Sequence, residues 1–212
     1  MKTKFVFLFV GLLLSLSVMA QSGGGGYFLI GSVYFPQIPQ MTANVNGVNN
    51  TLPQYMGMMG GGGFAIIKGL VIGGRGAGGA FTKKLNVNGV KAEYSFGGGE
   101  FNLGRVILHS KSVLSFLYLG IGGYDYGVEL ENKTDADVNL GSVIVPSGSK
   151  VNFEYGSFTL TGGLAIKYIR LKGLDLGLNV SYVYPFRQNY QTVMVGITLG
   201  SLGVTPPKEK NK

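Results

Sequence analysis

Residues 174–184 read Leu-Asp-Leu-Gly-Leu-Asn-Val-Ser-Tyr-Val-Tyr, and this stretch decides the fold class. Bulky apolar residues take every second position, and the positions between them are mostly small or polar. In a β-strand successive side chains point to opposite faces, so this strand has one bulky apolar face and one small polar face. The same alternation runs through residues 157–168 and 192–200. The C-terminal part of the chain therefore predicts three half-buried strands.

Extending this pattern along the chain places eight strands, at residues 26–35, 56–67, 70–83, 90–108, 112–131, 151–169, 173–186 and 190–202. The connections at 68–69, 109–111 and 170–172 are short, whereas those at 36–55 and 132–150 are long. Short and long connections alternate, which places all the long loops at one end of an up-and-down meander. We therefore expect an all-β fold, a single up-and-down antiparallel β-barrel of about eight strands.

The composition agrees with an apolar β-protein and excludes several other classes. The 212 residues include 37 Gly and no Cys, and only 13% of them are charged. Without cysteine, a disulfide scaffold, a cysteine-based metal site and a thiol enzyme are ruled out. Glycine interrupts nearly every window, so no helical periodicity extends over three turns. We attribute the mid-strand glycines to the strong coiling and small interior volume of a narrow barrel.

The N-terminus has the pattern of a secretory signal peptide. Lys2 and Lys4 precede an apolar run at residues 5–18, and Ala20 completes a small-residue cleavage pattern. No later run is long and apolar enough for a transmembrane helix, so an integral protein would have to cross as a closed barrel. The predicted organisation is a signal peptide at 1–20, a Gly linker at 21–25, the barrel at 26–203 and a polar tail at 204–212.

Tyrosine and phenylalanine gather where the predicted strands meet the long loops. Aromatic rings at one level are typical of a girdle at a membrane interface. Their abundance in strands of any kind is the alternative explanation. The predicted aromatic rim consists of Tyr34, Phe35, Tyr55, Phe81, Tyr94, Tyr126, Tyr155, Tyr184, Phe186 and Tyr190.

These features together resemble the small bacterial outer-membrane β-barrels of the OmpA/OmpX type, over about residues 26–202. The resemblance implies a non-enzymatic transmembrane barrel in the outer membrane, with an envelope-structural role or an adhesion role for its surface loops. It also implies contact with outer-membrane lipids and surface or cell-wall polymers. Two alternatives stay open, namely a barrel that binds or transports a small hydrophobic molecule and a secreted, lipocalin-like soluble barrel. An interior too narrow for all the aliphatic side chains favours the membrane barrel, in which they face lipid.

Charged residues within the strands predict ion pairs inside the barrel. A cation on the lipid face at mid-bilayer costs about 2–4 kcal/mol, so Arg75 should point inward and pair with Glu100. A two-residue turn at Asn88-Gly89 would place Arg75 opposite Asn102 and diagonal to Glu100. Lys167 lies on the small-residue face of its strand, with Asp175 as a candidate interior partner.

Two copies of Asn-Val-Asn-Gly-Val, at residues 44–48 and 86–90, fall in the predicted long-loop end. Asn-Gly is a strong signal for a type I′ turn, so we expect loop hairpins with tips at Asn46-Gly47 and Asn88-Gly89.

The sequence predicts no catalytic residue, cofactor site or metal site. His109 is the only histidine, and although Ser110 adjoins it, no carboxylate nearby in sequence would orient its ring. The Gly-rich run at 74–79 fits a dinucleotide-binding pattern but leads into a hairpin instead of a helix. We therefore expect no enzyme activity and no nucleic-acid partner, and the sequence leaves the oligomeric state open.

Overall fold

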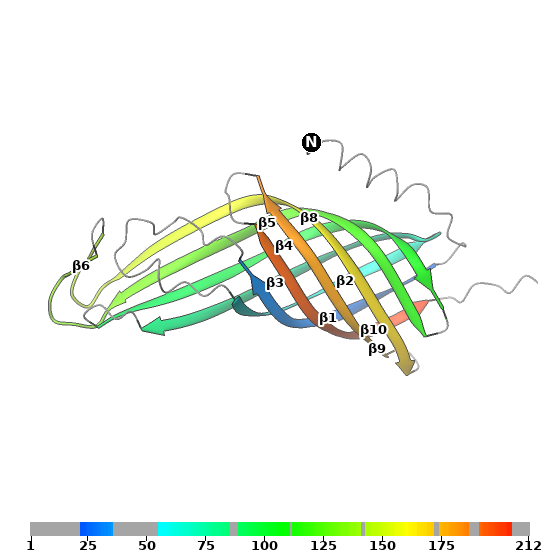
Figure 1. Ribbon diagram of the computed structural model, residues 1–212, viewed down its shortest axis with the longest axis horizontal. Coiled ribbons are helices and arrows are strands. Elements are labelled where there is room, and N and C mark those ends of the chain that lie inside the picture. Colours follow the sequence, from blue (N-terminus) through cyan, green and yellow to red (C-terminus); the bar gives the residue numbers. More distant parts are fainter. Residues whose placement is uncertain are drawn as a thin grey trace, which may run out of the picture.

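The chain folds into a closed antiparallel β-barrel (Figure 1). The computed structural model describes residues 22–35, 55–84, 89–110, 112–140, 143–171, 174–186 and 191–204, so the expected signal peptide lies outside the described residues. Around the barrel the strands follow the order β1-β10-β9-β8-β5-β4-β3-β2, and β6 and β7 form a separate small hairpin. The strands are β1 (Ser22–Tyr34), β2 (Tyr55–Ile67), β3 (Leu70–Lys84), β4 (Val90–His109), β5 (Val113–Asn132), β6 (Val138–Asn139), β7 (Ile144–Val145), β8 (Lys150–Leu171), β9 (Leu174–Pro185) and β10 (Thr192–Val204).

The up-and-down order confirms the predicted fold class, and the eight barrel strands agree closely with the predicted ones. One boundary was wrong. β1 starts at Ser22, and residues 23–25 pair with both β10 and β2, so they are not a linker. Glycine permits this because the strands approach closely there: a Cβ on Gly25 would lie 2.1 Å from the Ser201 carbonyl oxygen. The part of the chain that the structure describes has no helix long and apolar enough to cross a bilayer.

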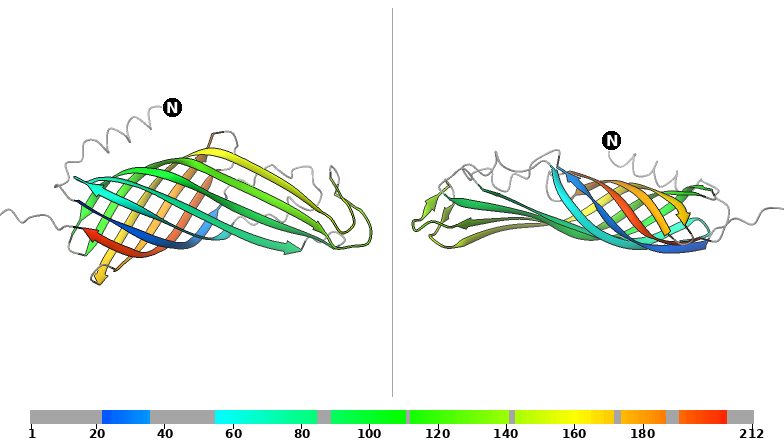
Figure 2. Two further views of the ribbon diagram at one scale, coloured as in Figure 1. Left: turned by 180° about the vertical axis from the view of Figure 1, so that it is seen from behind. Right: turned by 90° about the horizontal axis from the view of Figure 1, so that it is seen from below.

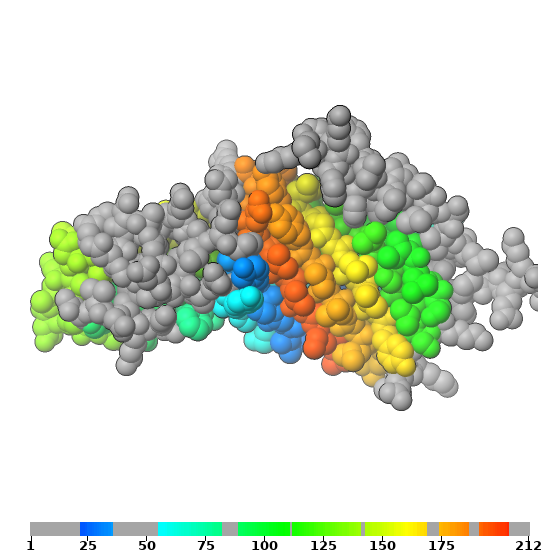
Figure 3. Space-filling view, viewed as in Figure 1, coloured from blue at the N-terminus to red at the C-terminus, as the bar shows by residue number. Residues whose placement is uncertain are grey.

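The outward surface of the barrel is apolar. On β9 the exposed residues are Leu174, Leu176, Leu178, Val180 and Tyr182, while the residues between them turn inward. The space-filling view shows β1, β10, β9 and β8 side by side on one face of this wall (Figure 3). Further exposed apolar residues on the other strands include Phe28, Ile30, Met59, Phe101, Leu103, Ile121, Phe158, Ile166, Val195, Ile197 and Leu199.

Four strands continue past the barrel at the long-loop end. The last pair between β8 and β9 is Thr159 with Pro185, and the last between β2 and β3 is Met59 with Gly78. Beyond these points β3, β4, β5 and β8 remain paired with one another as a curved sheet (Figures 1 and 2). We call this four-stranded part the extension. The full strands β4, β5 and β8 have 20 to 22 residues, whereas a strand that crosses a membrane has about 9–11. The surplus length of these strands protrudes from the barrel as the extension.

The glycines have different roles on the two faces of the wall. Gly122 faces the lumen, where a Cβ would lie 2.1 Å from the carbonyl oxygen of Gly99 on the neighbouring strand. Gly123 faces outward, and the nearest atom to its Cβ would be the Ser157 carbonyl oxygen at 3.8 Å. Only the inward glycine of this pair is therefore needed for the close approach of β4 and β5.

We expect Gly122→Ala to destabilise the barrel by about 1–3 kcal/mol, because the added methyl overpacks a closed wall. Gly123→Ala, the adjacent residue on the same strand, should be neutral or slightly stabilising, since Ala restricts the unfolded chain. Denaturant unfolding of both variants in the same detergent would measure the difference. Equal losses of stability would show that crowding of the lumen does not explain the inward glycine.

Candidate functional site: the lumen and the extension

Arg75 is the centre of a polar network that crosses the lumen. Its Nε lies 2.8 Å from Glu100 Oε1, and both side chains are almost completely buried. From β3 the guanidinium reaches β9 on the far wall, where Nη1 donates to Asn179 Oδ1 and Nη2 to Ser181 Oγ, each at 2.7 Å. Glu100 also accepts a hydrogen bond from Thr161 Oγ1 on β8. The structure thus brings the expected pair together and shows that it ties opposite walls of the barrel.

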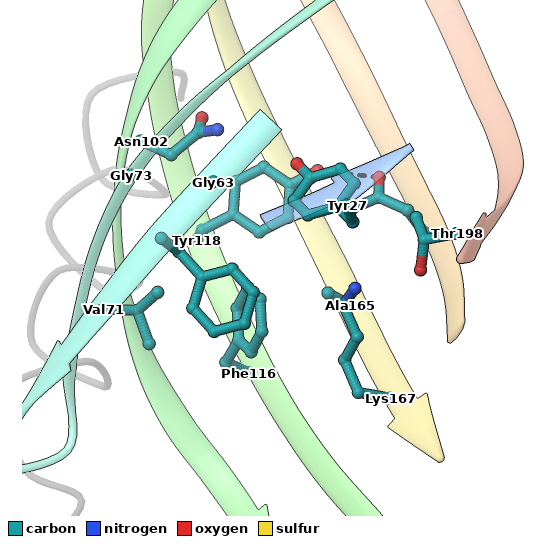
Figure 4. A pocket seen from close by; sticks show the side chains of 12 residues that line it. Tyr27, Gly63, Val71, Gly73, Asn102, Phe116, Tyr118, Ala165, Lys167 and Thr198 are labelled. Carbon is teal, nitrogen blue, oxygen red and sulfur yellow. Dashed lines mark hydrogen bonds between the residues drawn. The ribbon is translucent and has the colours of Figure 1, made fainter. Parts of the chain in front are cut away.

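The second charged pair lies between β8 and β9. Lys167 Nζ is 2.8 Å from Asp175 Oδ1, and both side chains are buried. The ammonium also lies 4.4 Å from the ring centroid of Tyr27 and 5.7 Å from that of Phe64, at distances suited to cation–π attraction. In Figure 4 Lys167 points toward Tyr27 across the inner part of the lumen. The two pairs together leave the polar middle of the lumen without net charge.

Apolar clusters close the lumen above and below the charged pairs. Toward the long-loop end, aromatic rings pack edge-on or stacked, with Phe35 and Tyr126 centroids 5.1 Å apart and Phe96 and Tyr124 5.2 Å apart. Toward the short-turn end, a second buried cluster includes Ile66, Val71, Val106, Leu114, Phe116 and Leu202.

A small cavity remains in the lumen, lined by Tyr27, Asn102, Tyr118, Lys167 and Thr198 among others (Figure 4). Its volume is about 20 Å³, room for about one water molecule. An acyl chain or a lipophilic ligand does not fit in it.

The register of β3 and β4 differs from the one that the Asn-Gly turn predicted. Arg75 lies directly opposite Glu100, and Asn102 lies opposite Gly73. The last pair of the hairpin is Lys84 with Lys91, so the connection is longer than a two-residue turn. Gly89 has the left-handed φ of +79° expected at a turn. The other predicted tip residues, Asn46, Gly47 and Asn88, lie outside the described residues.

Three residues of the predicted aromatic rim are not at a rim. Phe35, Tyr94 and Tyr126 are at most 1% exposed and belong to the apolar cluster inside the barrel and its extension. Side chains alternate between the two faces of a strand, and this alternation explains why these residues are inside. Tyr94 is six residues from the inward Glu100 on β4, so both point to the same face.

The remaining predicted rim residues divide between two places. Tyr34 and Tyr55 stack outside the barrel with ring centroids 4.7 Å apart, and Tyr184 and Phe186 form an edge-to-face pair. Phe81 and Tyr155 instead follow the inward parity of Arg75 and Tyr126 and line the concave side of the extension. Tyr190 lies outside the described residues.

The convex face of the extension is charged, in contrast to the apolar barrel wall below it. Along β4 the outward residues change from Phe101 through two glycines to Ser95, Glu93 and Lys91. On β5 and β8 the same change leads to Asp125, Glu129, Glu131, Lys150, Asn152 and Glu154. The row Gly97-Asp125-Gly156 marks the boundary between the two surfaces, at the level where β8 separates from β9.

The loop between β5 and β8 is held by Asn132 at the tip of the extension. Asn132 Nδ2 donates to the carbonyl oxygens of Ala136 and Val145, both at 2.9 Å, and its Oδ1 accepts from the Thr134 backbone N–H. The β6–β7 hairpin therefore has a fixed position, in which Ile144 is exposed. Lys150 donates to Glu129, and this contact raises the pKa of the Lys150 ammonium.

Comparison with solved structures gives the fold a known context. Ail, the attachment invasion locus protein of Yersinia pestis, aligns with 88% of this chain and 100% of its own, at 10% identity and a TM-score of 0.53. Neisserial surface protein A aligns with 85% of this chain and 96% of its own, at 9% identity and a TM-score of 0.53. The chain has the fold of small outer-membrane β-barrels. No protein-family model and no curated protein matches its sequence.

Proposed function

We propose that this protein is a non-enzymatic integral barrel of the outer membrane that displays the extension at the cell surface. The observation that carries the proposal is the division of the side chains. Aliphatic and aromatic residues coat the outside of the barrel, while the buried ion pairs and their hydrogen-bonding partners lie in the middle of the lumen, between two apolar clusters. Such an apolar wall is suited to a bilayer and not to water, and the closed barrel also satisfies its backbone hydrogen bonds within lipid.

The two alternative functions have less support. A lipocalin-like barrel holds its apolar rows inside, whereas the rows of β8, β9 and β10 point outward. A transporter of hydrophobic molecules needs a cavity or a path through the lumen. The interior cavity admits about one water molecule, and apolar clusters close the lumen on both sides of the charged pairs.

The extension supports an interaction role at the long-loop end. Ail has been solved in complex with sucrose octasulfate, a heparin analogue. The convex face of this chain carries more carboxylates than ammonium groups, which disfavours a sulfated polymer on that face. We propose that the convex face contacts neutral or basic surface partners, in addition to the structural role of the barrel in the envelope.

Membrane fractionation with a heat-modifiability gel tests the proposal. We expect the expressed protein to sediment with outer membranes and to migrate faster unboiled than boiled, because a folded barrel stays compact in detergent. Arg75→Met, which removes the contacts of Arg75 across the lumen, should reduce the fraction of protein in the fast-migrating band. A product found in the soluble fraction without detergent would contradict the proposal.

A further inference from the structure

The outward-facing charges of the barrel differ between its two ends. Of the described carboxylates, Glu100 and Asp175 are paired in the lumen. All the others lie at the long-loop end, namely Glu93, Asp125, Glu129, Glu131, Asp135, Asp137 and Glu154. At the short-turn end, Lys68 and Arg105 are outward-facing cations.

Arg105 lies on the outward face within apolar surroundings. On β4 it pairs with Leu70 of β3 on one side and Leu117 of β5 on the other, and Leu103 two residues away is exposed. The residue is half-buried, and its Nε is itself buried without a hydrogen-bond partner among the described residues. A guanidinium offers donors in a planar fork that matches a phosphate, and here no carboxylate of the described chain competes for it.

Lys68 is fixed beside Arg105 by the turn between β2 and β3. Its φ is 51° and that of Gly69 is 79°, the pair of left-handed conformations that a type I′ turn requires. The Gly69 carbonyl oxygen accepts a 2.9 Å hydrogen bond from the backbone N–H of Val106, the residue next to Arg105. Asn or Gly is favoured at the position of Lys68, so a lysine there needs an explanation other than the turn itself.

We propose that Lys68 and Arg105 form a binding site for the headgroup phosphate of an anionic phospholipid in the leaflet at the short-turn end. The inference rests on the proposed function, since the site requires a barrel inserted in a bilayer. Arg105 would contact the phosphate from the wall and Lys68 from the turn, while Leu70 and Leu117 pack against the acyl chains. The lipid supplies the counter-charge that the described residues do not supply.

Spin-labelled lipids provide the test. The full chain is inserted into vesicles of phosphatidylcholine, and the association of labelled phosphatidylglycerol is compared with that of labelled phosphatidylcholine. A basic residue near an anionic surface contributes about 1 kcal/mol, so each cation should account for about fivefold selectivity for phosphatidylglycerol. Arg105→Gln and Lys68→Asn should each lose about that factor. Lys150→Gln, at the opposite end, should keep the wild-type selectivity.

Two controls make the outcomes decisive. Lys68→Asn suits the left-handed turn, so its unfolding midpoint in phosphatidylcholine should not fall, and lost selectivity then reports the lost charge. Added inorganic phosphate should leave the lipid selectivity unchanged. If inorganic phosphate abolishes the selectivity, the site binds free anions instead of a lipid headgroup. If the heat-modifiability gel shows that the barrel is inserted, and the wild type and all variants select phosphatidylglycerol equally, this inference alone is overturned. A chain that does not insert would instead overturn the proposed function.

Discussion

Arg75→Met is expected to destabilise the folded barrel by about 3–5 kcal/mol, the largest effect of any single change considered for this chain. The substitution leaves the buried carboxylate of Glu100 without its counter-charge, and it also removes the donors to Asn179 and Ser181. Because those residues lie on the opposite wall, the variant loses the hydrogen bonds that join the two walls as well as an ion pair. Urea unfolding in phosphatidylcholine vesicles, followed by the heat-modifiable band, would measure the loss.

The matched control replaces both charges. Arg75→Met combined with Glu100→Leu removes the unpaired carboxylate, and apolar replacement of a whole buried pair is often close to neutral. We expect the double variant to regain most of the lost stability. A remainder should come from Ser181 and Thr161, which lose their partners, whereas Asn179 still accepts a hydrogen bond from Tyr118. If the Arg75→Met single variant unfolds at the same urea concentration as the wild type, Arg75 does not stabilise the barrel by joining its opposite walls.

Leu178→Arg is expected to cost about 2–4 kcal/mol in a bilayer, because it places a charge on the outward face near the middle of β9. Leu178 is 43% exposed, so the new side chain has space, and the cost comes from its transfer into lipid instead of from a steric clash. The readout is the free energy of unfolding in vesicles, with the wild-type chain measured in the same lipid.

Ser95→Arg is the control for this second prediction. Ser95 also faces outward and is exposed, but it lies on the charged convex face of the extension. A surface substitution of this kind normally changes stability by less than about 0.5 kcal/mol. Similar costs at both positions would show that the apolar wall and the convex face share one environment, contrary to the proposed membrane boundary.

The sequence was sufficient to predict the fold and the partners of both interior ion pairs. Alternation of side-chain types located the strands, and the alternation of loop lengths gave the up-and-down order. The ion pair between Arg75 and Glu100 forms although the predicted register was two residues out. A shift of two residues keeps every side chain on its own face, whereas a shift of one would have separated the pair.

Other features could be found only from the three-dimensional structure of the closed barrel. The contacts of Arg75 with Asn179 and Ser181 cross the lumen, and their positions depend on the stagger of the strands around the barrel, which strand patterns do not reveal. The buried positions of Tyr94 and Tyr126 were available from parity, since Tyr94 shares the face of Glu100. The predicted strand at 90–108 is longer than a membrane crossing, and the extension could have been predicted from this length but was not.

The central claim is that the aliphatic rows face lipid, and a spin-label scan along β9 tests it most directly. The chain has no cysteine, so single cysteines at positions 174–184 can be labelled without further changes. In phosphatidylcholine vesicles, collisions with oxygen, which concentrates in lipid, should peak at positions 174, 176, 178, 180 and 182. The positions between them should be shielded from oxygen and from a water-soluble nickel reagent alike. The opposite phase, with the even-numbered positions from 174 to 182 shielded and the odd-numbered positions between them open to lipid, would contradict the claim.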